Sequence, residues 1–67
     1  MAYPNIAAER VRKGWSQEDL ARILGVSRKT LYNWERAGRI PAVALDRMAD
    51  IFGVTVDYLL SVEAKGD

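Results

Sequence analysis

The chain has 67 residues, of which 49% are hydrophobic and 28% charged, and this composition predicts one small globular domain over residues 1–67. It contains neither cysteine nor histidine, which rules out disulfides and argues against a zinc site and histidine-based catalysis. No apolar run is long enough for a membrane span or a signal peptide, so we expect a cytoplasmic protein without membrane contacts.

The net charge of +1 conceals an uneven distribution of charge along the chain. Residues 10–39 hold eight basic and three acidic side chains, which gives this segment a net charge of +5, whereas the remainder carries −4. A basic segment in an otherwise acidic chain favours a polyanionic partner for that segment.

The first helix is predicted over residues 6–13, after a loose lead-in over residues 1–4. Asn5 is a candidate N-cap because its side chain can accept a hydrogen bond from the first free N–H groups of a helix. Ile6 and Val11 are the candidate inward residues.

Two short helices joined by a tight turn are predicted within residues 17–34. Ser16 would cap the first helix, with Asp19 completing a capping box, and Ser27 would cap the second. Gly25 can adopt the left-handed conformation that ends a helix. The inward residues at helical spacing are Leu20, Ala21, Leu24, Val26, Leu31 and Trp34. Such a unit is a helix-turn-helix, whose second helix enters a DNA major groove.

Two further helices complete an all-α prediction. They cover residues 42–52 and 56–60, and an ordered core of about residues 5–61 is followed by a polar tail, residues 62–67. The inward residues are expected to be Leu45, Met48, Ala49, Phe52, Leu59 and Leu60.

Several apolar residues can be assigned either to the core or to a binding surface. Trp15 and Trp34 are expected to pack in the core, because their apolar spacing fits packing better than stacking on single-stranded nucleic acid. Ile23, Val43 and Ile51 either cover the edges of the core or form a small dimer contact together with residues near 56–60.

The outer face of the second helix of the unit, residues 28–36, has the chemistry of a base-reading surface. On a helical wheel at about 100° per residue, basic, amide and phenol side chains gather on one side. Arginine and lysine suit guanine, asparagine suits adenine, and tyrosine can touch a thymine methyl group. The alternative is an ordinary solvated face. The candidate base contacts are Arg28, Lys29, Asn33 and Tyr32.

Other polar residues are candidate contacts to DNA phosphates. Gln17, the first residue of its predicted helix, can use both its amide and the helix N-terminus, and Ser16 can assist. Arg36, Arg39 and Lys13 are further candidates, although a solubilising surface charge is an equally good interpretation of these three.

Glu35 is predicted to have a structural role. It lies at the edge of the inward face of its helix, beside Trp34, where a lone acid needs a partner. An arginine on the first helix, Arg10, would supply that partner and form a partly buried bridge that orients the second helix of the unit.

The segments WSQEDLARILGVSRKTLYNWERAG and ALDRMADIFGVTVDYLL resemble the Cro/lambda-repressor-like helix-turn-helix family, over residues 6–60. This resemblance implies a compact five-helix domain that binds operator DNA, usually as a dimer. It also implies the phosphate contact of Gln17 and the pair of Arg10 with Glu35.

The chain departs from the family pattern at a few positions. Trp15 stands where a smaller aliphatic residue is expected, and Arg28 and Lys29 are more basic than the glutamine pair of some relatives. The operator sequence therefore does not follow by analogy.

The resulting hypothesis is a Cro-like, phage- or prophage-type repressor that binds double-stranded DNA as a homodimer on a partly symmetric operator and blocks or touches RNA polymerase. A complete small protein and a part of a larger repressor both fit. The alternative is an antitoxin or protein-interaction module that also binds its own operator. No enzyme activity, cofactor, metal or small-molecule ligand is expected.

Overall fold

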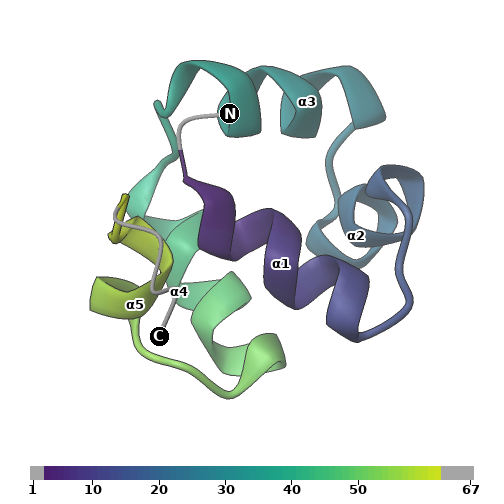
Figure 1. Cartoon of the computed structure of the whole chain (residues 1–67). Coiled ribbons are helices and arrows are strands. Elements are labelled where there is room, and N and C mark those ends of the chain that lie inside the picture. The colour runs from purple at the N-terminus through teal and green to yellow at the C-terminus, as the bar shows by residue number, and fades with distance from the viewer. Residues whose placement is uncertain (1–2, 63–67) are drawn as a thin grey trace.

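The computed structural model describes residues 3–62, and these residues form five helices and no strand (Figure 1). The helices are α1 (Pro4–Arg12), α2 (Gln17–Leu24), α3 (Arg28–Ala37), α4 (Ala42–Phe52) and α5 (Val56–Leu60). The prediction of an all-α, five-helix fold is therefore confirmed. Within the described part of the chain, no helix has the length and apolar content that crossing a bilayer requires. Most of the predicted polar tail, residues 63–67, lies outside the described residues.

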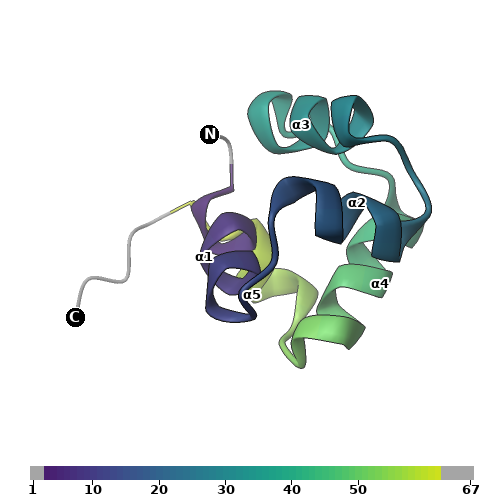
Figure 2. The same cartoon turned by 90° about the vertical axis from the view of Figure 1, so that its right-hand side faces the viewer.

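The helix α3 lies at one edge of the molecule. Figures 1 and 2 show it above α1 and α2, with α4 and α5 toward the opposite side. Helix α2 packs against both α3 and α4, and α5 packs against both α1 and α4. This arrangement leaves one long face of α3 free of other helices.

Every helix contributes one fully buried side chain to a single core. These side chains are Ile6, Leu20, Leu31, Met48 and Leu59, in the order of the five helices. Burying an aliphatic side chain of this size stabilises a fold by about 1.5–3 kcal/mol. The core therefore ties all five helices together although α5 is only five residues long.

The predicted caps of the helix-turn-helix unit are present. Ser16 Oγ accepts from the Asp19 N–H and the Asp19 carboxylate accepts from the Ser16 N–H, which makes a reciprocal capping box at the start of α2. Gly25 has a φ of 76° and ends α2, and Ser27 then caps α3 by accepting from the Thr30 N–H. The turn between the two helices is thus short and fully specified by local chemistry.

Two predictions about α1 are wrong. The helix begins at Pro4, whose fixed φ and missing N–H suit the first turn, so Asn5 lies inside the helix and is not its N-cap. Val11 is 65% exposed. The physical reason is the helical phase: five residues after Ile6, Val11 is rotated by about 140° from the buried face, whereas Glu9 and Arg10 fall near that face.

Buried polar residues of α1 bind α5, which the sequence analysis missed. The Asn5 amide donates to the carbonyl oxygen of Tyr58 at 2.8 Å, and the Tyr58 hydroxyl donates to the Glu9 carboxylate at 2.9 Å. Arg12 lies 3.3 Å from the same carboxylate. The bond to Glu9 raises the pKa of Tyr58, because the phenol must keep its proton to donate.

The two tryptophans pack against the core, as predicted. The ring centroid of Trp15 lies 6.0 Å from that of Phe52, so the unexpected bulk of Trp15 finds an aromatic neighbour on α4. Ile51 also packs against the core. Ile23 is exposed, and Val43 is 74% exposed.

Acidification is expected to remove the contribution of the capping box to the stability of the folded state. Hydrogen bonds from the Ser16 N–H and hydroxyl hold the pKa of Asp19 below its ordinary value, so the folded state favours the carboxylate. The contribution is therefore present above pH of about 4, the unfolded pKa, and is lost as the pH falls through the lower folded pKa.

Thermal melts of the wild type and of Asp19→Asn, followed by circular dichroism, test this expectation. The wild type should melt at the higher temperature from about pH 5 to pH 7, and the difference should shrink below about pH 4. A difference that does not change with pH would contradict it.

Candidate nucleic-acid interface

The inner face of α3 holds the helix on the domain. Leu31 is fully buried and Glu35 is 4% exposed, one helical turn further along. Trp34, which lies between these two residues in the sequence, is half-buried and also packs against the core. This inner face fixes the rotation of α3 about its axis, and so decides which residues point outward.

The outer face of α3 carries the four candidate base contacts and one candidate phosphate contact. All five side chains are exposed, including the large aromatic side chain of Tyr32, which is 48% exposed. The structure therefore brings together on one accessible surface Arg28, Lys29, Tyr32, Asn33 and Arg36. Whether they contact DNA stays a prediction.

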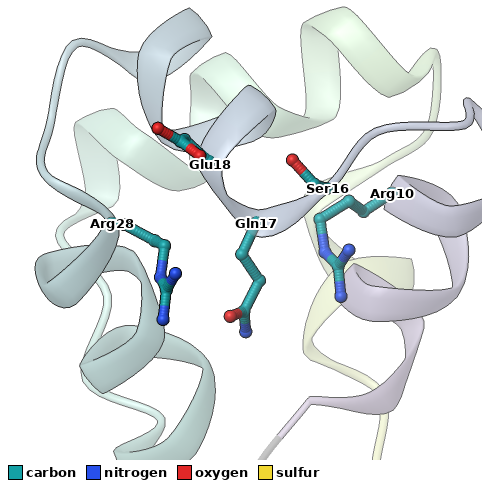
Figure 3. Close-up of a pocket in the computed structure, with 5 residues that line it drawn as sticks. All are labelled: Arg10, Ser16, Gln17, Glu18 and Arg28. Carbon is teal, nitrogen blue, oxygen red and sulfur yellow. The ribbon is translucent and has the colours of Figure 1, made fainter.

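A first hollow lies between α1, α2 and the start of α3. Its volume is about 410 Å³, and it is lined by Arg10, Ser16, Gln17, Glu18 and Arg28. Figure 3 shows Gln17 extending between the side chains of Arg10 and Arg28, whereas Ser16 and Glu18 point the other way. The amide of Gln17 and two guanidinium groups thus share a space that suits an anion.

Ser16 and Gln17 differ in how much hydrogen-bonding capacity they have left. The Ser16 oxygen already accepts from the Asp19 N–H at 3.0 Å, so capping occupies it as an acceptor. The Gln17 amide reaches away from its own helix, and Gln17 also lines a second hollow of about 250 Å³ with Tyr32, Glu35 and Arg36. Gln17 therefore lines both hollows.

Arg10 and Glu35 form an ion pair between α1 and α3. Arg10 Nε lies 3.6 Å from Glu35 Oε2, and the two side chains are 13% and 4% exposed. The distance is too long for a hydrogen bond, and these two atoms have no other hydrogen-bond partner among the described residues. Arg10 is also anchored through Nη1, which donates to the Trp15 carbonyl oxygen at 3.0 Å.

A second contact of Glu35 is absent from the sequence analysis. Gln17 Nε2 lies 3.4 Å from Glu35 Oε1, a long hydrogen bond across 18 positions of the chain. No periodic pattern marks such a pair, because the two residues belong to different helices. The same holds for Arg10 and Arg28, which the structure places at one hollow.

Two candidate phosphate contacts stand apart from both hollows. Lys13 is exposed at the C-terminal cap of α1, and Arg39 is exposed in the loop after α3. Neither lines the hollows beside Gln17. The structure therefore groups only part of the predicted phosphate set around the start of α2.

Comparison with known proteins fits this arrangement. A family model described as helix-turn-helix matches residues 6–59, a range that includes every candidate site residue from Arg10 to Arg39. The chain belongs to this helix-turn-helix family. The resemblance found in the sequence is thereby confirmed.

Two similar proteins are described as HTH-type transcriptional regulators. The chain is 38% identical over 57 residues to the HTH-type transcriptional regulator AnsR of Bacillus subtilis strain 168, with 84% of the chain and 49% of that protein covered. It is 37% identical over 59 residues to the uncharacterized HTH-type transcriptional regulator YazB of the same strain, with 87% and 86% covered. The chain thus spans about half the length of AnsR and most of YazB.

A solved structure has the same fold. The hypothetical transcription factor NHTF from Neisseria is 40% identical to this chain and superposes with a TM-score of 0.74. The match covers 84% of this chain and 64% of that one.

Removing the Glu35 carboxylate is expected to destabilise the domain. Glu35→Ala leaves a cavity and strands the largely buried Arg10, so we expect a loss of about 2 kcal/mol in the free energy of unfolding. Glu18→Ala removes an exposed acid and should cost less than about 0.5 kcal/mol. Urea titrations of both variants test this, and equal stabilities would count against the ion pair as an anchor of α3.

Proposed function

We propose that this chain is a transcriptional regulator that binds double-stranded DNA sequence-specifically, with α3 in the major groove. The observation that carries the proposal is the division of α3 into two faces. Leu31 and Glu35 are buried, and the opposite face exposes only side chains that donate hydrogen bonds or stack, apart from Ala37 at its end. The family relationship to the regulators AnsR and YazB supports it.

In this proposal the position of each exposed residue decides whether it contacts a base or a phosphate. Arg28, Lys29 and Asn33 read base edges, because the N-terminal part of a recognition helix reaches deepest into the groove, and Tyr32 assists them. Gln17 binds a phosphate from the start of α2. The remaining phosphate contacts are Ser16, Arg36, Arg39 and Lys13.

Selection of bound sequences from a random duplex pool, followed by titration of the selected duplex at several salt concentrations, tests the proposal. We expect one enriched motif and an affinity that falls steeply with salt, by about 0.9 in the logarithmic slope per phosphate neutralised. A chain that enriches no motif and ignores duplexes at low ionic strength would not be a DNA-binding regulator.

Base and phosphate contacts should differ in their mutational signatures. Asn33→Ala and Arg28→Ala should each relax preference at particular base pairs by about 1–3 kcal/mol. Gln17→Ala should weaken all duplexes alike, because a phosphate contact carries no sequence information.

Binding of these variants to the selected duplex and to its single-base substitutions measures the difference. Arg47→Ala is the matched control: Arg47 is an exposed arginine on α4 and donates to the Ile23 carbonyl oxygen, away from the outer face of α3. It should leave base preference unchanged. A uniform loss in Asn33→Ala would contradict its assignment as a base contact.

We also propose that two copies bind one partly symmetric operator and act as a repressor by occupying it. The ten residues of α3 span about 15 Å, and base pairs are about 3.4 Å apart, so one copy reads only about four or five base pairs. Two copies on half-sites about 34 Å apart read twice as many and reach the same side of the duplex.

Spacing variants of the selected duplex test the dimer. Inserting about 5 base pairs between the half-sites should abolish joint binding, and inserting about 10 should restore part of it, because the half-sites then face the same side again. Gel-shift stoichiometry and affinity measure both effects. An isolated half-site that binds as tightly as the full operator would contradict a dimer.

A further inference from the structure

The orientation of the Gln17 side chain is the starting point. Gln17 lines both hollows, and its tip lies between Arg10 and Arg28 (Figure 3). A glutamine amide has an acceptor end, Oε1, and a donor end, Nε2, with two N–H groups. Only the donor end can bind a phosphate, so a freely rotating amide would often present the wrong end to DNA.

Glu35 supplies the group that distinguishes these two ends. An ionised carboxylate only accepts hydrogen bonds, and its Oε1 lies 3.4 Å from Gln17 Nε2. This contact uses one N–H group of the amide and leaves the second free. The opposite orientation would place Gln17 Oε1 against the carboxylate and is disfavoured by repulsion between the two oxygens.

The surroundings of Glu35 suit it to orienting a neighbour and not to binding DNA. Its side chain is 4% exposed, so it cannot turn outward, and the adjacent guanidinium of Arg10 balances its charge near a phosphate. The 3.4 Å bond to Gln17 is long. It therefore directs the amide while leaving it free to move toward a phosphate.

We infer that Glu35 is a positioning residue for DNA binding: it holds the Gln17 amide with a free N–H group available to a backbone phosphate beside α2. This inference rests on the proposed function, and it gives Glu35 a role in addition to its ion pair with Arg10. The DNA contact itself is made by Gln17.

A double-mutant cycle on the selected duplex separates positioning from a purely structural role. Glu35→Ala should weaken binding by about two- to tenfold when Gln17 is present, the range expected for one neutral hydrogen bond. In the Gln17→Ala background the same substitution should weaken binding by a clearly smaller factor, because there is no amide left to orient and only the anchoring of α3 by the ion pair is lost. Equal losses in both backgrounds would overturn the inference.

Further variants separate the hydrogen bond from folding. Glu35→Gln offers both an acceptor oxygen and a donor NH₂ group, so it no longer distinguishes the two ends of the Gln17 amide and should restore only part of the lost affinity. If Glu35→Ala does not fold, Glu35→Leu removes the acceptor while filling the space, and it replaces the alanine variant in the cycle. Asp46→Ala, at an exposed carboxylate on α4, is the control and should bind like the wild type.

A measurement on the free protein distinguishes failure of the inference from failure of the proposed function. The side-chain NH₂ resonances of Gln17 should shift between the wild type and Glu35→Ala, or Glu35→Leu, and not in Asp46→Ala. Resonances that do not respond to loss of the carboxylate would overturn the inference without any DNA present. If the Gln17 resonances differ between the wild type and these variants but the wild type binds no duplex, the proposed function is overturned instead.

Discussion

The placement of α3 on the domain depends on a small number of buried residues. Of its ten residues, only Leu31 and Glu35 are buried, with Trp34 half-buried beside them. A helix with so narrow an apolar stripe gains little from burial, so its rotation is set by these residues together. Leu31 supplies apolar contact, and the charge of Glu35 requires that the carboxylate face Arg10 and Gln17. The exposed face of α3 follows from this single constraint.

The charge distribution follows the same division. Of the basic residues of segment 10–39, Arg28, Lys29 and Arg36 lie on α3 and Arg10 lines the hollow beside the start of α2, whereas the acids of α4 are exposed on another helix. Glu35 is an exception because it is an acid inside the basic region. Its burial beside Arg10 keeps it from cancelling the positive surface, and its oxygens remain available to orient neighbouring donors.

Much of the fold could be predicted from the sequence, because local signals coincide with the helix ends. The Ser16 and Ser27 caps and the turn at Gly25 each act within a few residues, and the structure has them where the sequence places them. The start of α1 differs from the expected one because Asn5 resembles a cap, although Pro4 is the better first residue. A residue that suits a helix cap can instead lie inside the helix and bind a partner elsewhere in the fold, as Asn5 does with the Tyr58 carbonyl oxygen.

The candidate site was predictable only in part. The outer face of α3 follows from helical periodicity, and the ion pair of Arg10 with Glu35 was anticipated through family resemblance. The contact between Gln17 and Glu35 depends on how α2 and α3 cross, which periodicity does not contain. For the same reason the shared hollow of Arg10 and Arg28 is visible only in three dimensions.

The attachment of α1 to α5 has a consequence for how this sequence can diverge. Asn5 binds the backbone carbonyl of residue 58, which any amino acid supplies, whereas Glu9 binds the hydroxyl of Tyr58 itself. Loss of that hydroxyl would leave a buried acid with only the exposed Arg12 as a partner. The hydroxyl–carboxylate bond therefore couples the residue types at positions 9 and 58 energetically, while position 5 is independent of the residue type at 58.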